Sequence, residues 1–278
     1  MTIKSEDFQL CESITEEEAK LLNEKDTSSN LKFDGVRVIA VVQNGQTALV
    51  GRRGIYPFQF KEVTEDMGKM PNGIYDGEII SHCDTFNKIQ RRAGTRDRRK
   101  QEELRKEIPA KYMVFDILNL KGQSLTSKPL RERIEILKKV FEEFDKEVTN
   151  KKPSGGLITI EMAEYKPINE MLKKAHEEDR EGIIVKNLNS PYEHKRSKGW
   201  LKCKFFLETT IKICRYTENP KGIRVEDKFG NACQVAGEQS IEVKHLLDTQ
   251  KEVEINIQYL EKTVEGRFRF PSYRGLVK

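Results

Sequence analysis

The dipeptide Asn44-Gly45 separates two runs in which apolar and polar residues alternate, and this feature limits the possible folds more than any other. Asn-Gly is the preferred sequence of a two-residue hairpin turn, and a period of two is typical of strands with one buried face. The sequence therefore predicts an antiparallel hairpin over residues 31–53. Further strand-like runs lie at residues 73–80, 112–120, 158–165, 182–188 and 199–206.

Helical periodicity is found in a few separate segments. Residues 13–22 predict a short helix with Ser13 or Thr15 as its N-cap, and acidic residues fill its first turn. Residues 130–144, opened by Pro129, and residues 169–180 show apolar residues at helical spacing. Together with the strands, these segments predict an α+β fold in which antiparallel sheets are flanked by helices.

The character of the chain changes after Leu207, where short strand-like segments are separated by Gly, Asn and Asp. About seventy residues of this kind are typical of a small β-barrel of the oligonucleotide-binding (OB) type. We therefore expect a domain boundary near residues 206–209. The larger domain is predicted over residues 1–207, and the smaller OB-fold domain over residues 208–278.

The composition excludes several classes of protein. Hydrophobic residues make up 36% and charged residues 34%, which fits a folded chain rather than a disordered one. The sequence contains no apolar run long enough to span a membrane and no apolar signal segment, and its five cysteines form no C-x-x-C pair. We expect an intracellular protein without a membrane partner. Its net charge is only +5, so an anionic partner must meet a local basic patch.

Lys32 lies in an otherwise apolar run, close to Asp34, Gly35 and Arg37. One interpretation is an edge-strand lysine whose amine reaches water. The other is a nucleophile whose amine is activated by neighbouring cations or a metal. In the second case Asp34 shares the face of Lys32, Gly35 lets the backbone turn or approach a ligand closely, and Arg37 reaches a ribose or a phosphate.

Six short elements in a fixed order carry a resemblance to a known superfamily. They are KFDGVR (32–37), GRRG (51–54), YDGE (75–78), VFD (114–116), EGIIVK (181–186) and WLKCK (200–204). This order resembles the covalent nucleotidyltransferases, namely ATP-dependent DNA ligases, RNA ligases and mRNA capping enzymes. Gly51 stands where the superfamily usually has serine. Chance does not explain six such elements in one order.

The resemblance implies a role for each element. Lys32 would attack the α-phosphorus of ATP and expel pyrophosphate, and Lys202 and Lys204, which alternate along one strand, would stabilise the developing charge. Phe115 would offer a flat face to adenine. Glu78 and Glu181 would hold Mg²⁺ or Mn²⁺, which needs few protein ligands. The implied nucleotide-binding residues are Arg37, Arg52, Glu78, Phe115 and Lys186.

Three segments favour DNA ligases within the superfamily. Residues 86–92 are similar to the F-x-x-x-x-x-R segment of these enzymes, residues 129–133 to P-L-x-E-R, and residues 266–275 to the segment that closes their β-barrel. The basic stretch 91–106 is either a patch that binds DNA phosphates or a solvated loop and helix start. The residues expected to contact DNA are Arg52, Arg91, Arg92, Arg96, Arg98 and Lys198.

The sequence departs from the family pattern at two points, and three other functions are alternatives to a DNA ligase. Asn30 stands where the family often has an acidic residue, and the chain ends at GLVK without the usual R-x-D-K element. We expect a monomeric ATP-dependent DNA ligase from the cytoplasm of a bacterial or phage-infected cell. Such an enzyme seals 5′-phosphate/3′-hydroxyl nicks in duplex DNA through a lysyl-AMP and a DNA-adenylate. The alternatives are an RNA ligase, a GTP-using capping enzyme, and a nucleic-acid-binding protein that has retained the fold.

Overall fold

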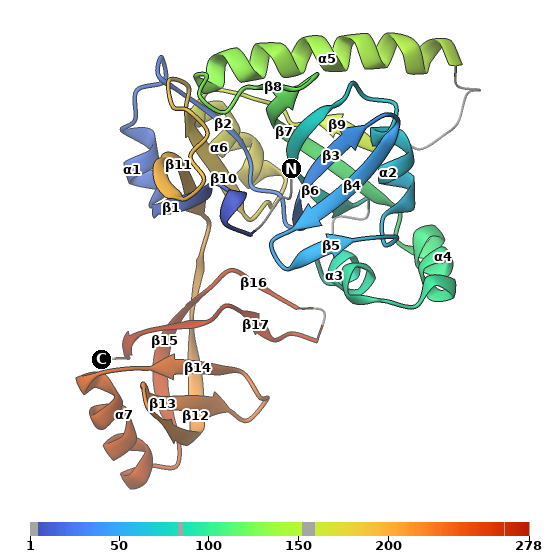
Figure 1. Cartoon of the computed structure of the whole chain (residues 1–278). Coiled ribbons are helices and arrows are strands. Elements are labelled where there is room, and N and C mark those ends of the chain that lie inside the picture. Colours follow the sequence, from blue (N-terminus) through green and yellow to red (C-terminus); the bar gives the residue numbers. More distant parts are fainter. Residues whose placement is uncertain (1–4, 83–85, 152–158, 264, 278) are drawn as a thin grey trace. The chain divides into compact units, whose positions relative to one another are not determined.

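The chain divides into two compact units, Met1–Cys203 and Lys204–Lys278 (Figure 1). The computed structural model describes residues 5–82, 86–151, 159–263 and 265–277. Each unit has a hydrophobic core of its own. Within these described ranges, no helix has the length and apolar character needed to cross a membrane.

The larger sheet of the first unit has seven strands, and its main path runs β5-β4-β3-β6-β7-β8. The pairs along this path are antiparallel, while β9 lies parallel to β7. The strands are β3 (Val36–Gln43), β4 (Gln46–Gly51), β5 (Gly54–Tyr56), β6 (Gly73–Ser81), β7 (Ala110–Leu120), β8 (Gln123–Ser124) and β9 (Ile160–Met162).

The second sheet of this unit has four strands in the order β1-β11-β10-β2. β1 pairs in parallel with β11, and β10 pairs antiparallel with β2. The strands are β1 (Leu10–Ile14), β2 (Thr27–Leu31), β10 (Gly182–Asn187) and β11 (Arg196–Lys204).

The predicted hairpin is confirmed, but its first strand is not continuous. Asn44 and Gly45 have φ of 51° and 77°, as the two-residue turn requires. The expected strand over residues 31–43 is wrong at its start, because β2 ends at Leu31 in one sheet and β3 begins at Val36 in the other. Residues 32–35 form the connection between the two sheets, so Lys32 does not lie on a strand.

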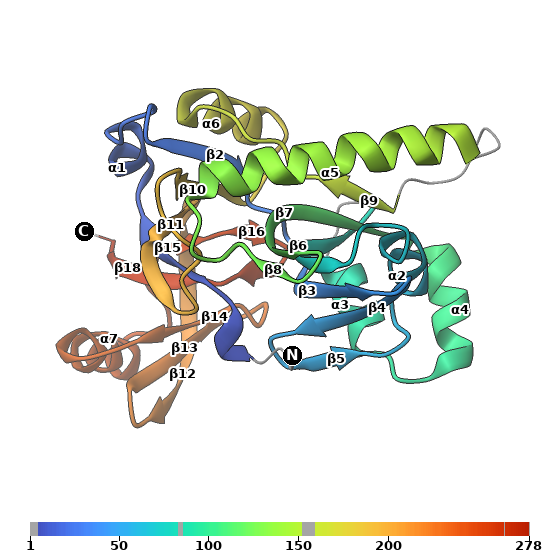
Figure 2. The ribbon, with the colours of Figure 1, turned by 45° about the horizontal axis from the view of Figure 1, so that its top comes forward.

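The helices of the first unit include the predicted ones and three that were not expected. Thr15 caps α1 and forms a capping box with Glu18. The longest helix, α5, contacts β7 and β9 and lies across them in Figure 2. The helices are α1 (Glu16–Lys20), α2 (Lys61–Met67), α3 (Phe86–Gly94), α4 (Arg98–Glu107), α5 (Leu130–Lys151) and α6 (Ile168–Glu177), of which α2, α3 and α4 were unexpected.

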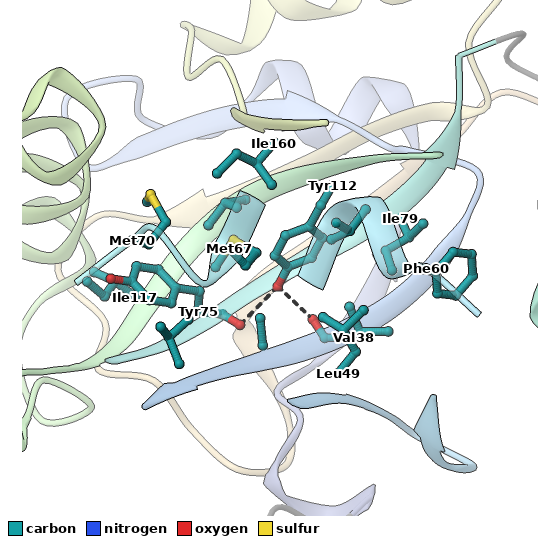
Figure 3. Close-up of a cluster of buried hydrophobic side chains, with 14 of the residues drawn as sticks. Val38, Leu49, Phe60, Met67, Met70, Tyr75, Ile79, Tyr112, Ile117 and Ile160 are labelled. Atoms are coloured by element: carbon teal, nitrogen blue, oxygen red, sulfur yellow. Dashed lines mark hydrogen bonds between the residues drawn. The ribbon is translucent and has the colours of Figure 1, made fainter. Parts of the chain in front are cut away.

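The larger sheet buries both of its faces. Along β3, Val38, Ala40 and Val42 point into the main core, which Figure 3 shows in part. The Tyr112 hydroxyl in this core lies 3.0 Å from the carbonyl oxygens of both Val38 and Tyr75 and shares its proton between them. Ile39, which alternates with these residues, packs instead in a smaller core with side chains of β10 and β11. The second face therefore lies against the second sheet.

A buried ion pair fixes the start of α5. Arg133, from the P-L-x-E-R segment at the start of α5, donates two hydrogen bonds of 2.8 Å to Asp116 on β7, and both side chains are fully buried. Its guanidinium also donates to the Lys128 carbonyl at 2.6 Å. The segment thus anchors the helix to the sheet.

The second unit contains a five-stranded sheet in the order β14-β13-β12-β15-β18. The outer strands β14 and β18 lie close together, so the sheet curls. Helix α7 (Glu238–Thr249), which the sequence interpretation missed, lies between β14 and β15 in the chain. The strands are β12 (Leu207–Asn219), β13 (Gly222–Asp227), β14 (Ala232–Val235), β15 (Val253–Tyr259) and β18 (Ser272–Leu276), with a separate pair of β16 (Glu261–Lys262) and β17 (Phe268–Arg269).

Candidate active site

A cavity of about 680 Å³ is lined by both sheets of the first unit. Its larger-sheet side carries Arg37, Arg52, Arg53, Tyr56, Glu78 and Phe115, and helix α3 adds Gln90. The four-stranded sheet contributes Cys11, Asn30, Ile184, Lys186, Arg196, Trp200 and Lys202. Most of the side chains expected to bind nucleotide thus meet in one place.

Lys32 enters this cavity from the connection between the sheets. Its ammonium lies 2.5 Å from the Glu181 carboxylate, and its backbone N–H donates to the Gly182 carbonyl at 2.9 Å. The Lys32 side chain is 20% exposed and that of Glu181 is 6% exposed, so the pair is screened from most of the solvent. The lysine is therefore held at the start of β10.

Gly35 brings the same connection close to β6. A Cβ atom at this position would lie 2.2 Å from the Ile79 carbonyl oxygen and 3.0 Å from Cγ of Glu78. Because the nearest obstacle is backbone, no side chain fits without moving the connection. The close approach at Gly35 is thus to β6, and the expected approach of this backbone to a ligand stays a prediction.

Glu78 presents its carboxyl group to the cavity from β6. Burial raises the pKa of this carboxyl to about 8, although the positive charges of Lys32 and Arg37 act in the opposite direction. At neutral pH these surroundings therefore favour the protonated form of Glu78. A bound cation would reverse this balance, because it stabilises the carboxylate.

Lys186 and two aromatic rings form another part of the wall. The Lys186 ammonium lies 4.4 Å from the centre of the Phe115 ring and 4.2 Å from that of Trp200, and it donates to the Tyr165 hydroxyl at 2.9 Å. Only 2% of Lys186 is exposed. Burial lowers its pKa to about 7, while Asp116 and Asp76 favour the charged form. This amine can thus gain or lose a proton near neutral pH.

Arg37 is held mainly by other protein groups. Its guanidinium donates to both carboxylate oxygens of Asp76, at 3.1 and 2.7 Å, and to the Gln9 carbonyl at 2.6 Å. The Tyr192 hydroxyl donates to the same carboxylate at 2.7 Å. Arg37 therefore joins β3 to β6 and to the N-terminal segment, and its predicted contact with the nucleotide stays a prediction.

The two lysines of β11 differ in position. Lys202 lines the cavity, whereas Lys204 is absent from the lining as far as the described residues define it. The Lys204 ammonium instead lies 5.3 Å from the centre of the Phe270 ring, within the second unit. Their alternation along the strand is as expected, but of the two only Lys202 lines the cavity that Lys32 enters, as far as the described residues define it.

One of the expected DNA contacts is contradicted. Arg92 is 1% exposed, and it donates to both Glu62 oxygens at 2.5 and 2.6 Å and to the carbonyls of Gln59 and Ile108. Its guanidinium is occupied inside the protein and presents no surface to a phosphate. Arg92 is therefore a structural residue that joins α3 to α2.

The other basic residues of this group are exposed. Arg91 forms a 2.9 Å ion pair with Glu107 between α3 and α4, and Arg98 lies over the Phe58 ring. Arg96 and Lys198 are exposed, and Lys198 lies on β11 rather than in the loop that the sequence suggested. Their contacts with DNA stay predictions.

Several cavity residues were not identified from the sequence. Arg53, Tyr56, Gln90, Cys11 and Arg196 all line the cavity. Only Arg53 carried a usable signal, because it directly follows Arg52 in the GRRG element. The others come from strands and a helix whose positions depend on the fold.

Asn30 bears on the binding of a nucleotide base. Its amide nitrogen donates to the Glu164 carbonyl at 2.6 Å, while its buried Oδ1 has no hydrogen-bond partner among the residues that the structure describes. An unpaired buried acceptor costs free energy unless a donor reaches it. An amino group on a bound base is a donor of the required kind, so the site fits ATP.

The acidic residues are compatible with a cation that keeps most of its waters. In the described part of the chain, no group of three or more His, Cys, Asp or Glu side chains is arranged to hold a metal. Magnesium commonly binds through one or two carboxylates together with phosphate oxygens. Glu78 in the cavity and Glu181 beside Lys32 meet this smaller requirement.

Relatives of known type match most of the chain. The chain is 28% identical over 287 aligned positions to the SPbeta prophage-derived DNA ligase-like protein LigB of Bacillus subtilis, covering 91% of this chain and 93% of that protein. It is 31% identical over 201 residues to a DNA ligase of Methanothrix thermoacetophila, covering 68% of this chain and 34% of the relative. A probable DNA ligase of Koribacter versatilis is likewise covered over 34% of its length, so the chain spans about a third of these larger relatives.

Solved structures share the fold. A structure of Lig E DNA ligases matches with a TM-score of 0.68 at 17% identity, covering 97% of this chain and 98% of the other. A mycobacterial DNA ligase D complexed with ATP and MES matches with a TM-score of 0.59 at 19% identity, covering 97% and 94%. The family model for the ATP dependent DNA ligase domain matches residues 8–204, which contain all of the described residues that line the cavity except Glu6. The chain therefore belongs to the family of ATP-dependent DNA ligase domains.

Proposed function

We propose that the protein seals nicks in duplex DNA at the expense of ATP. The observation that carries the proposal is the position of Lys32. Its amine lies where two sheets meet, paired with Glu181, in a cavity that also holds Glu78 and Lys202. Family membership supports the use of ATP.

The reaction proceeds in three transfers of the adenylyl or phosphoryl group. Lys32 Nζ forms a bond to the α-phosphorus of ATP and pyrophosphate leaves. The AMP then passes to the 5′-phosphate of the nick and the lysine is released. The adjacent 3′-hydroxyl finally attacks that phosphate and AMP leaves. Such reactions depend mainly on positioning and on neutralising charge.

The residues of the cavity divide this work among them. Lys202 and Arg52 supply positive charge to the phosphates, and Lys186 with Phe115 forms the wall for the base. Glu78 and Glu181 hold Mg²⁺ or Mn²⁺, which neutralises phosphate charge when bound. Asn30 Oδ1 accepts a hydrogen bond from the adenine amino group, because its amide nitrogen is already fixed by Glu164.

The two units take different roles in this proposal. The first unit, corresponding to the domain expected over residues 1–207, carries the nucleotidyltransferase chemistry. The second, expected over residues 208–278, is an OB-fold, supported by its order of three strands, a helix and two strands in a curled sheet. Arg52, Arg91, Arg96, Arg98 and Lys198 contact the DNA backbone.

Intact mass after mixing with ATP and magnesium tests the first transfer. We expect a gain of one AMP in the parent protein and none in Lys32→Ala. Lys173→Ala, which removes an exposed lysine on α6, keeps the gain. An adduct in Lys32→Ala, or one formed from GTP but not ATP, contradicts the proposal.

Sealing of end-labelled nicked duplexes tests the remaining transfers. Closure is expected when the 3′-hydroxyl belongs to a deoxyribonucleotide. Sealing only where a ribonucleotide supplies that hydroxyl would instead identify an RNA ligase.

A further inference from the structure

Tyr56 of β5 lines the cavity, on the wall that also carries Arg52 and Arg53. We propose that the Tyr56 hydroxyl donates a hydrogen bond to a phosphate group bound there, and that Gly51 makes room for its ring. This inference rests on the proposed function, since it adds a binding residue to the same site.

Gly51 and Tyr56 are coupled by their packing. A Cβ atom at Gly51 would lie 2.6 Å from Cε2 of Tyr56 and 3.3 Å from Cζ, closer than real Cβ atoms come to a ring. Gly51 does not have positive φ, so the limit is space and not backbone conformation. The ring of Tyr56 thus occupies the room that a side chain at position 51 would need.

A second contact fixes the ring. The centre of the Tyr56 ring lies 5.6 Å from that of Phe60, with an angle of 64° between their planes. Phe60 is fully buried in the main core. An aromatic pair in this edge-on arrangement is more stable than its buried area alone would make it. The hydroxyl is therefore presented from a defined position.

The hydroxyl is a donor in need of an acceptor. It has no hydrogen-bond partner in the part of the chain that the structure describes, and the residue is partly buried. Burial raises its pKa, and Glu78 raises it further while Arg53 acts in the opposite direction. The phenol thus keeps its proton at neutral pH and can donate it to an oxygen.

The neighbouring charges indicate which oxygen is bound. Arg52 and Arg53 are exposed and form no ion pair with any carboxylate of the described residues. Two uncompensated guanidinium groups beside a neutral O–H donor suit a phosphate, because each can supply a charge-assisted hydrogen bond. Such a phosphate belongs either to ATP or to the 5′-end of the nicked strand.

Tyr56→Phe is the decisive variant because it removes the donor and keeps the ring, with its contacts to Gly51 and Phe60. Two rates are measured separately: formation of the AMP adduct from ATP, and single-turnover transfer of AMP from purified adenylylated protein to a nick. We expect one of them to fall by about ten- to a hundredfold, the effect of one hydrogen bond to a charged group. The slowed step tells which phosphate is bound.

Control measurements distinguish loss of phosphate binding by the Tyr56 hydroxyl from loss of folding. They also distinguish failure of this inference from failure of the proposed function. The urea midpoint of Tyr56→Phe is expected to match that of the parent protein. Tyr216→Phe, which removes a surface hydroxyl bonded to Asp248 in the second unit, is expected to keep both rates. Both rates unchanged in Tyr56→Phe, or equal losses in Tyr216→Phe, overturn the inference. Absence of an adduct in the parent protein overturns the proposed function instead.

Gly51→Ala tests the packing argument. The added methyl group pushes the ring from its place, so the step slowed by Tyr56→Phe is expected to be slowed here too. In the double variant the hydroxyl is already lost, and its rate is expected to equal that of Gly51→Ala alone. If the loss of rate in the double variant equals the product of the two single losses, Gly51 acts independently of the hydroxyl. That result overturns the coupling.

Discussion

Glu181 pairs with Lys32 at 2.5 Å across a distance of 149 positions in the chain. In this ion pair the amine is an ammonium and has no lone pair with which to attack phosphorus. The pair therefore holds Lys32 in an unreactive form, and a bound cation that attracts the Glu181 carboxylate would free the amine from it.

Glu181→Gln removes both the counter-charge and a proposed ligand of the cation. We expect the rate of AMP adduct formation at fixed magnesium to fall by about 10²-fold, as when a single electrostatic group is removed from an active site. The rate is followed by intact mass. Glu161→Gln, which disrupts an ion pair with Lys111 outside the cavity, serves as the matched control. An unchanged rate in Glu181→Gln would contradict the role of this carboxylate.

Glu78 predicts a pH dependence of metal binding. Since the pKa of its buried carboxyl is about 8, a cation must displace a proton below that pH. Apparent affinity for Mn²⁺ is expected to rise by about tenfold per pH unit up to pH 8 and then to level off. Electron paramagnetic resonance measures free Mn²⁺ in such a titration. Glu78→Gln should bind weakly with no slope, and a slope that persists in this variant would refute the assignment.

The same carboxyl predicts a gain in stability when it is neutralised. A raised folded-state pKa means that ionisation opposes folding, so stability is lost as pH rises from the unfolded value toward 8. Glu78→Gln is expected to unfold with a free energy higher than the parent by about 1–4 kcal/mol at pH 8, and by less at pH 5. Urea unfolding at the two pH values gives the comparison. If the variant and the parent differ in free energy of unfolding by the same amount at pH 5 and pH 8, the pKa of the Glu78 carboxyl is not raised by folding.

Gly35→Ala is expected to slow adduct formation by about 10²-fold without unfolding the protein. The new methyl group meets the Ile79 carbonyl, so the connection that carries Lys32 must move away from β6. A shift of the nucleophile by about 1 Å can cost 10²-fold in rate. Gly94→Ala at the end of α3 is the control, because its added Cβ meets nothing within 4 Å. Normal adduct formation by Gly35→Ala would show that the close approach is dispensable.

Arg92 and Arg96 are neighbours in sequence with opposite expected effects. Arg92→Met leaves Glu62 buried without its partner and is expected to lower the free energy of unfolding by about 3–5 kcal/mol. Arg96→Met is expected to change it by less than about 0.5 kcal/mol, and to reduce the salt dependence of nicked-duplex binding by about one unit of slope. Urea unfolding and binding at several salt concentrations test both. If Arg92→Met instead keeps the stability and reduces the salt dependence of binding, Arg92 is a DNA contact after all.

The features of the fold that could be predicted from the sequence are those that depend on residues close together in the chain. The Asn44-Gly45 turn needs only a few adjacent positions and was predictable, and the N-cap of α1 could be narrowed to Ser13 or Thr15, of which the structure has Thr15. The motif residues Lys32, Glu78 and Lys202 were expected to share a site because a family resemblance supplied their proximity, and all three line the cavity.

What depends on distant pairing could not be predicted. The period-two pattern continues through residues 32–35, so nothing local reveals that β2 pairs with β10 and β3 with β6. Arg92 lies in a run of basic residues that resembles a solvated patch, and its partner Glu62 is 30 positions away. The cavity position of Tyr56 follows from the packing of β5 beside Gly51.

The chain contains one tryptophan, Trp200, and the fold places it in the cavity wall. It is 1% exposed, with the Lys186 ammonium 4.2 Å from its ring centre and the Phe115 ring 5.7 Å away. Indole emission is sensitive to nearby charge and stacking, so the protein carries its own optical reporter. Loading and discharge of the site can therefore be followed in real time on unlabelled material.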